Sequence, residues 1–294
     1  MINTTRYNID TCSMLVEFMT SVWTARKLDK SSTDELVQRK NAASKDAARV
    51  NKHLLAGRTE LDGIIKHIGT LRNQYFYPKT LPWTDNGLRL LPTVSFMEFN
   101  QRMVDEEGIF WDLVNDFVAV YPSLITAQAM ALGDMFDRAD FPTPEDVRTK
   151  FAFHVNYIPV PTSGDFRVDI GNAAAQELKD KFEEFSATRV DAAMADVRKR
   201  LKEHLQRMSD RLTVDVVGGE ARARVFHDSL LDTGLELCDS VKSLNLVGDQ
   251  DLEAARKHLE KTITGLGAAD LRKDVSVRTD VKKQVDSILS SMTW

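Results

Sequence analysis

The stretch ASKDAARVNKHLLAGRTELDGIIKHIGTL, from Ala43 to Leu71, carries a clean periodic pattern. Its small and apolar residues recur at alternating spacings of four and three, which places them on one face of a helix and is typical of a coiled-coil seam. A helix with such a seam has to pack it against another helix. The seam consists of Ala43, Ala47, Val50, Leu54, Gly57, Leu61, Ile64, Ile68 and Leu71.

The helix is expected to extend beyond the seam on both sides. Asp34 and Glu35 place negative charge in a first turn, which the N-terminus of a helix favours. The sequence therefore predicts a single helix over residues 34–74, about 60 Å long at a rise of about 1.5 Å per residue. Few globular cores need a helix of that length.

A second apolar ladder runs from Leu178 to Leu212, with slips in its spacing that change a supercoil without ending the helix. The region between the ladders reads as a compact head, so the first ladder can enter it and the second can leave it. We therefore expect the two ladders to pair as an antiparallel stalk within one chain. Ordinary globular packing of the helices and a homo-oligomeric coiled coil remain alternatives.

The head is predicted from shorter patterns. Residues 15–28 are rich in β-branched and aromatic residues and predict a strand. Prolines and a turn sequence between Tyr75 and Pro92 predict an aromatic loop packed on a core. The other expected elements are a helix opened by Ser95 and Glu98, helices over 109–120 and 123–136 divided by Pro122, a helix start at Thr143, and a hairpin of strands at 151–157 and 166–170.

After the second ladder, Gly218-Gly219 indicates a hinge, and three shorter helices are expected over 220–246, 251–266 and 277–292. The predicted fold is α+β and predominantly α, with a coiled-coil stalk and a small antiparallel sheet. Its predicted domains are an N-terminal head strand (1–33), the first stalk helix (34–74), the head (75–172), the second stalk helix (173–217) and a C-terminal helical region (218–294).

Composition narrows the class of protein. Among 294 residues, 43% are apolar and 28% are charged, as in ordinary globular proteins, and the formal net charge of -5 argues against broad nucleic-acid binding. Cys12 and Cys238 lie far apart, and the start of the chain does not look like a secretion leader. No apolar stretch is long enough to cross a bilayer. We expect a protein of a reducing cytoplasm with no membrane contact.

No motif carries a recognisable chemistry. His227-Asp228 with Asp232 superficially resembles a metal phosphohydrolase site, but further histidines at useful spacings are missing. Neither cysteine has the neighbours of a catalytic nucleophile, and Gly218-Gly219 lacks the lysine that follows in a phosphate-binding loop. The sequence thus predicts a non-enzymatic protein without catalytic residues, metal ligands or a cofactor.

Basic residues gather in the second ladder. Arg198, Lys199 and Arg200 begin the densest basic stretch, but acidic residues interrupt it and it lies opposite the apolar stripe. Such a run is typical of a solvated helix face. Contact with nucleic acid through these three residues remains a minority alternative.

Four stretches of the chain share a resemblance. They are YFYPKTLPWTDNGLRLLP (75–92), SVWTARKL (21–28), LGDMFDRADFP (132–142) and FAFHVNYIPVPTSGDFRV (151–168). Their aromatic, proline and glycine positions resemble, in order, those of a family of tailed-phage and prophage proteins known only as a domain of unknown function. The resemblance covers roughly residues 15–215.

The resemblance implies a phage protein, often encoded beside a MoxR-like AAA+ ATPase and a von Willebrand A domain protein. That neighbourhood suggests an adaptor or assembly partner of a remodelling system. The alternatives are an inhibitor of a host defence complex and a nucleic-acid-processing accessory protein. Self-association is expected as well, and the candidate partner-binding residues are Trp83, Arg89, Asp34, Arg198, Lys199 and Arg200. Trp83 and Arg89 have a competing structural role, which is to fix the head to the stalk.

Overall fold

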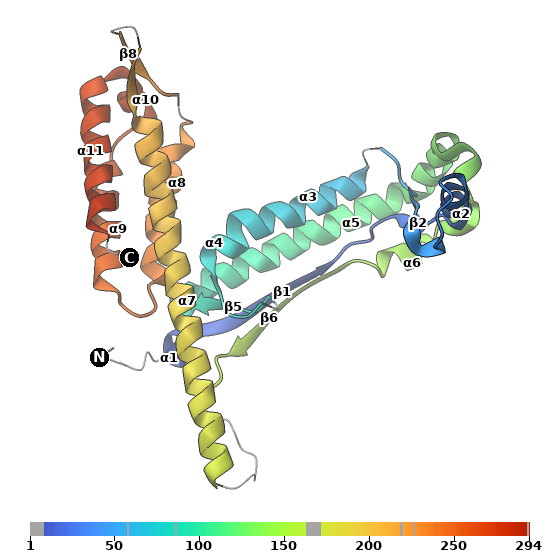
Figure 1. Ribbon diagram of the computed structural model, residues 1–294, viewed down its shortest axis with the longest axis horizontal. Helices are drawn as coiled ribbons and strands as arrows, with labels where there is room; N and C mark the ends of the chain where they lie inside the picture. Colours follow the sequence, from blue (N-terminus) through green and yellow to red (C-terminus); the bar gives the residue numbers. More distant parts are fainter. Residues whose placement is uncertain are drawn as a thin grey trace. The chain divides into compact units, whose positions relative to one another are not determined.

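The computed structural model describes residues 9–57, 59–85, 87–162, 172–217, 220–225, 227–292 and 294. The chain forms two compact units, each assembled from separate segments (Figure 1). Unit 1 comprises Met1–Glu17, Tyr75–Asn100 and Asn156–Trp294, and unit 2 comprises Phe18–Gln74 and Gln101–Val155. The fold is mainly helical with a small antiparallel sheet, as the sequence predicts.

The sheet has four strands in the order β4-β5-β1-β6. Antiparallel pairing sets Leu15 of β1 and Leu81 of β4 against Leu90 of β5, and all three side chains are buried in the core of unit 1. The predicted strand at 151–157 is confirmed. The strand predicted over 15–28 is confirmed only as far as Ser21, because residues 26–28 form a separate strand of another sheet. The predicted strand at 166–170 lies outside the described residues. The strands span Ser13–Ser21 (β1), Leu81–Pro82 (β4), Arg89–Pro92 (β5) and Ala152–Pro159 (β6).

A four-helix bundle makes up most of unit 1. The helix α7 contacts α8 and α11, and α9 contacts the same two helices, so the four close into a ring (Figure 1). The second ladder is confirmed as one uninterrupted helix, α7, and its apolar residues from Val190 onward are buried. The helices span Asn172–Leu212 (α7), Ser229–Leu244 (α8), Gln250–Ile263 (α9), Ala268–Lys273 (α10) and Val275–Ser291 (α11).

The predicted helix over 220–246 begins later than expected. A hairpin of β7 (Val214–Val217) and β8 (Glu220–Ala223) follows α7, with Val216 paired to Ala221. β-branched residues favour strands, which explains why the valines around position 216 leave the helix. The predicted hinge at Gly218-Gly219 lies outside the described residues.

Arg278 of α11 closes the C-terminal end of α7. Its side chain is only 2% exposed. Its Nε donates to the carbonyl of Leu212 at 3.0 Å, and one terminal nitrogen donates to the carbonyls of Arg211 and Arg224 at 2.6 Å each. The last carbonyls of a helix have no partner within the helix, so the guanidinium satisfies acceptors that burial would otherwise leave without a hydrogen bond.

Unit 2 is organised around α5 (Phe96–Leu132), which begins one residue after Ser95 as predicted. Figure 1 shows α3 (Glu60–Leu71) beside it, and His67 of α3 contacts Glu106 of α5. The buried face of α5 has spacings of three and four. Within unit 2 it includes Met103, Phe110, Val114, Phe117, Tyr121 and Ile125.

The predicted break at Pro122 is wrong, because α5 continues through it. A proline inside a helix costs about 3 kcal/mol, since it removes a hydrogen bond and crowds the preceding turn. Here the buried face continues on both sides of it. The ring of Tyr121 packs edge-on against Trp23 at 5.5 Å, and its hydroxyl donates to the carbonyl of Pro142. Packing of Tyr121 and Ile125 offsets the local cost.

The predicted helix over 34–74, and with it the first half of the stalk, is wrong. The segment forms α2 (Lys30–Arg39), a short 3-10 turn, the strand β3 (Asn51–His53) and then α3. Ala43 and Ala47 of the seam are exposed outside any α-helix. From Leu61 to Leu71 the seam is helical and buried, but it belongs to unit 2, whereas α7 belongs to unit 1.

Local conformation and distant partners explain this interruption. Asn41 and Gly57 have positive φ angles of 49° and 96°, which end helices, and β3 pairs with β2 (Arg26–Leu28). Gln128 accepts from the backbone N–H of Ala56 at 2.9 Å and donates to its carbonyl at 3.1 Å. A new helix then begins at Thr59. Small seam residues bury too little surface to outweigh these bonds.

The remaining elements are short. They are α1 (Ile9–Cys12), a π turn at Arg72–Phe76, α4 (Tyr77–Lys79) and α6 (Pro144–Arg148). The predicted helix start at Thr143 is confirmed in α6, because its hydroxyl accepts from the backbone N–H of Asp146. Proline at the first helical position suits the fixed φ of that residue.

Candidate interaction site

Trp83 lies in the interior of unit 1. It is 4% exposed and belongs to the core formed by Leu15, Leu90 and the apolar face of α7. A side chain in this position adds buried apolar surface to the fold and offers no face to another molecule. The expectation of a partner-binding residue at Trp83 is therefore wrong, and its observed role is to fill the core of unit 1.

Arg89 and Arg200 converge on one backbone carbonyl. Arg89 donates to the hydroxyl of Thr80 at 2.6 Å and to its carbonyl at 3.0 Å, and Arg200 donates to the same carbonyl at 2.9 Å. Arg200 also lies 2.6 Å from Asp196, and the guanidinium of Arg89 stacks over Tyr77. Burial and the nearby charge of Arg200 lower the pKa of Arg89 to about 10. Both arginines thus hold the segment before β4.

Arg198 is engaged in the same internal way. It donates to Asp249 Oδ2 from two nitrogens, at 2.9 and 2.5 Å. Asp249 caps α9 by accepting from the backbone N–H groups of Asp251 and Leu252. Although burial raises the pKa of Asp249, the N–H of Leu252 and the charge of Arg198 hold it below its usual value. Arg198 therefore joins α7 to α9.

The basic stretch forms no basic patch. Of Arg198, Lys199 and Arg200, Lys199 alone projects, with 71% of its side chain exposed and Glu203 3.9 Å away. Asp34 is exposed on α2. Both positions are compatible with contact; Lys199 belongs to unit 1 and Asp34 to unit 2.

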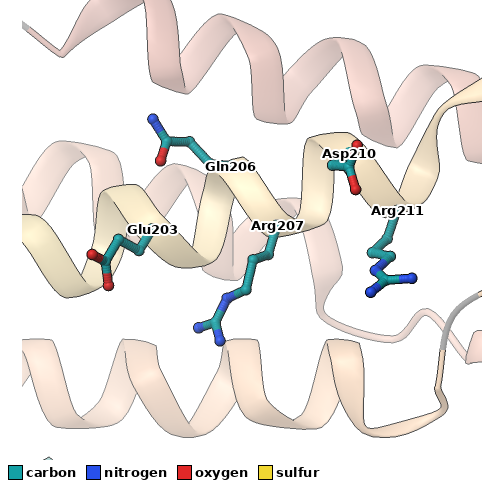
Figure 2. A pocket seen from close by; sticks show the side chains of 5 residues that line it. All are labelled: Glu203, Gln206, Arg207, Asp210 and Arg211. Carbon is teal, nitrogen blue, oxygen red and sulfur yellow. The ribbon is translucent and has the colours of Figure 1, made fainter.

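Beyond Lys199, the outward face of α7 holds a shallow hollow. Glu203, Gln206, Arg207, Asp210 and Arg211 line it (Figure 2). Asp210 forms an ion pair with Arg224. Acidic and basic side chains alternate along this single helix, so the hollow has neither the enclosure nor the convergent polar groups of a small-molecule site.

A second face of α5 was missed by sequence reasoning. Val104, Trp111 and Val118 recur at a spacing of seven, so they line one side of the helix, along the edge of its buried face. Val104 is 53% exposed, and Trp111 and Val118 are half-buried. The spacing is visible in the sequence. The strong apolar content of the adjoining buried face of α5 concealed it.

Charge and stacking define the surroundings of this stripe. Arg148 of α6 stacks over Trp111 at 5.7 Å and donates to the side chain of Asn115. On one flank, three exposed carboxylates follow the stripe along α5. They are Asp105, Asp112 and Asp116. We call Val104, Trp111 and Val118 with these carboxylates the α5 face.

Two buried reactive groups belong to unit 1. Burial raises the pKa of the Cys238 thiol to about 12, so it is held neutral and unreactive at ordinary pH. His204 of α7 is 2% exposed, its Nε2 makes no hydrogen bond, and burial lowers its pKa to about 4. The described part of the chain contains no group of His, Cys, Asp and Glu able to hold a metal ion.

None of the helices in the described residues combines the length and apolarity needed to cross a membrane. No known protein family matches the chain, and neither a curated protein nor a solved structure shows significant similarity to it.

Proposed function

We propose that this chain is a non-enzymatic interaction protein that binds another protein through the α5 face. The supporting observation is an apolar stripe on α5 that extends from the edge of its buried face out into solvent. Packing of α3 and β6 does not require Val104 to be apolar, since that side chain remains half in solvent. An apolar stripe bordered by charge is the pattern that helix-binding surfaces use.

The partner in this proposal carries an apolar face with Lys or Arg beside it. Asp105, Asp112 and Asp116 favour positive charge on one side of the stripe, and Gly108, exposed between Val104 and Trp111, allows close approach of a helix. Arg148 holds Trp111 in place, so part of the surface is already ordered before binding.

The resemblance to phage proteins supports a proposal for where in the cell this interaction takes place. There the chain acts in the host cytoplasm as an adaptor of a AAA+ remodelling system. The inhibitor of a host defence complex is the alternative within the same class. The nucleic-acid accessory role loses support, because Arg198 and Arg200 bind acceptors within unit 1.

The test is affinity capture from phage-infected cells with the tagged full chain. Val104→Lys places a positive charge on the α5 face, and Val275→Lys is its matched control, since Val275 is 49% exposed in unit 1. We expect Val104→Lys to lose the captured partner and Val275→Lys to keep it. Circular dichroism verifies that both variants fold.

Each result of the capture bears on the proposal. An ATPase lost only with Val104→Lys supports the adaptor, and a defence protein lost in the same way supports the inhibitor. Capture that nuclease treatment abolishes, or a partner retained by Val104→Lys, refutes binding through the α5 face.

A further inference from the structure

The two-stranded sheet of β2 and β3 in unit 2 has one face whose charges are balanced within the chain. Its register places Lys27 directly opposite Lys52, and like charges in such a pair destabilise a sheet. Both lysines form ion pairs with Asp140, whose side chain is 6% exposed. Although burial raises the pKa of Asp140, its hydrogen bonds with the two lysines hold that pKa below its usual value. Asp140 therefore stays charged and offsets the repulsion between the lysines.

The opposite face of this sheet carries cations without such an acid. Side chains alternate along a strand, so the residues beside the lysines lie on the other side of the sheet. There Arg26 is paired with His53 and Leu28 with Asn51, and all four are exposed. Within the described residues, no carboxylate forms an ion pair with Arg26 or His53. We call these four residues, together with exposed Arg49 just before β3, the β2-β3 face.

The surroundings of the β2-β3 face are basic, although the chain as a whole is acidic. Residues 26–53 contain eight Lys and Arg against four Asp and Glu, whereas the full chain contains 39 against 44. One of the four acids, Asp29, is buried because it caps α2. A local excess of positive charge attracts an anionic partner. The other exposed charges of this segment are the cations Lys30, Arg39 and Lys40 and the acids Asp34, Glu35 and Asp46.

The form of the β2-β3 face favours double-helical DNA over other polyanions. The major groove of B-DNA admits a two-stranded β-ribbon, and arginine and asparagine hydrogen-bond to phosphates and to base edges. The five residues of the face include no large aromatic ring of the kind on which unpaired bases stack in single-strand binding proteins. Double-helical RNA fits less well, because its major groove is too deep and narrow for side chains to read.

We infer that the β2-β3 face binds double-helical DNA, with Arg26 and Arg49 neutralising phosphates. This surface uses none of the three basic residues of α7 that the sequence singled out. It also differs from the α5 face, so it adds a second kind of partner to the proposed protein-binding role. The negative charge of the whole chain is compatible with it, because the contact is local.

The experiment titrates a short fluorescent DNA duplex with the purified full chain and follows anisotropy at several salt concentrations. Arg26→Glu with Arg49→Glu should weaken binding at least about tenfold. Arg26→Gln with Arg49→Gln should reduce the slope of log affinity against log salt by about 2, since two phosphate contacts are lost. Arg26→Lys with Arg49→Lys should restore binding, because lysine still neutralises a phosphate.

The matched control is Lys199→Glu with Arg207→Glu. It makes the same change of charge at two exposed residues of α7 and should bind the duplex like the wild type. Circular dichroism verifies that every variant folds.

Several results would overturn the inference. They are a wild-type chain that does not bind the duplex at low salt, a double glutamate variant of the β2-β3 face that binds undiminished, and a control that weakens binding equally. Tighter binding to single-stranded DNA, duplex RNA or polyglutamate would assign the face to another ligand and overturn it as well. Because only purified components are used, this outcome is independent of the capture experiment.

Discussion

Replacing Arg278 by methionine should be one of the most damaging single changes in unit 1. Methionine keeps the unbranched apolar stem and removes the donors. The carbonyls of Leu212, Arg211 and Arg224 then lose bonds of 3.0, 2.6 and 2.6 Å in a site where Arg278 is 2% exposed. A buried acceptor left without a partner costs about 1–3 kcal/mol.

Only the bond to Leu212 is fully buried, and those to Arg211 and Arg224 are partly buried, so these costs add up to an upper limit on the lost free energy of unfolding. Other effects reduce that loss. Burial already holds the pKa of Arg278 below its usual value, so removing its charge recovers some desolvation cost. Water that reaches the C-terminal end of α7 can hydrogen-bond to the freed carbonyls, which reduces the free-energy cost further. We therefore expect Arg278→Met to lower the free energy of unfolding by about 3 kcal/mol.

Urea unfolding followed by far-UV circular dichroism measures this change. Arg278→Lys should fall between wild type and methionine, because one ammonium cannot reach all three carbonyls. Arg272→Met is the control: its ion pair with Asp228 is solvent-exposed, and its loss should cost under about 1 kcal/mol. If Arg278→Met is no more destabilising than Arg272→Met, the capping argument for α7 is wrong.

Three further predictions concern the helix cores. Burial lowers the pKa of His204 to about 4 in the fold, against its ordinary value of about 6.5, so the unfolded chain binds the proton first. Stability is full above pH 6.5 and should decline by about 3 kcal/mol as pH falls to 4, with no such decline in His204→Leu, as measured by urea unfolding across pH. Gly234→Ala places a methyl group 2.9 Å from Ile263 Cδ1 and 3.0 Å from His204 Nε2, so it should lower the thermal midpoint even though alanine favours helices; a raised midpoint would contradict the close approach of α8. Leu61→Ala removes a buried side chain of α3 and should cost about 2–5 kcal/mol, whereas Ile65→Ala, exposed on the same helix, should change denaturant stability little; equal effects would mean that the seam is not buried as described.

Sequence periodicity predicted those elements whose packing residues lie on one continuous face of the element. The helix over Asn172–Leu212 follows from its apolar ladder, and the start of α6 follows from Thr143 and Pro144. Both depend on interactions within a few residues or on a long stripe, and neither requires knowledge of distant contacts.

The helix predicted from the first ladder, over residues 34–74, is wrong for a physical reason. Ala43 and Ala47 match the helical period, but their side chains bury little apolar surface. The periodic pattern was therefore not supported by a free energy of burial large enough to form the helix. The conformation was decided by Gln128, more than 70 residues away along the chain, which bonds both backbone groups of Ala56. Lys52 of β3 is likewise paired with Asp140. No local pattern contains these partners.

Distant partners also explain why the prediction for the basic candidate residues did not hold. A run of basic residues indicates a solvated or ligand-binding face only when its charges remain free. Asp249 and the carbonyl of Thr80, both distant in sequence, occupy Arg198 and Arg200. The α5 face was accessible to sequence reasoning, since Val104, Trp111 and Val118 repeat every seven residues, but exposure was needed to distinguish it from a core stripe.

The division of unit 1 among three chain segments has a consequence for synthesis. Leu15 and Leu90 leave the ribosome well before the residues of α7 that complete their core. Until translation reaches the C-terminal bundle, these β1 and β5 side chains have no completed interior to enter, and edge strands exposed at that stage invite aggregation. Stalled or truncated nascent chains should therefore be strong clients of ribosome-associated chaperones, whereas the finished chain should not.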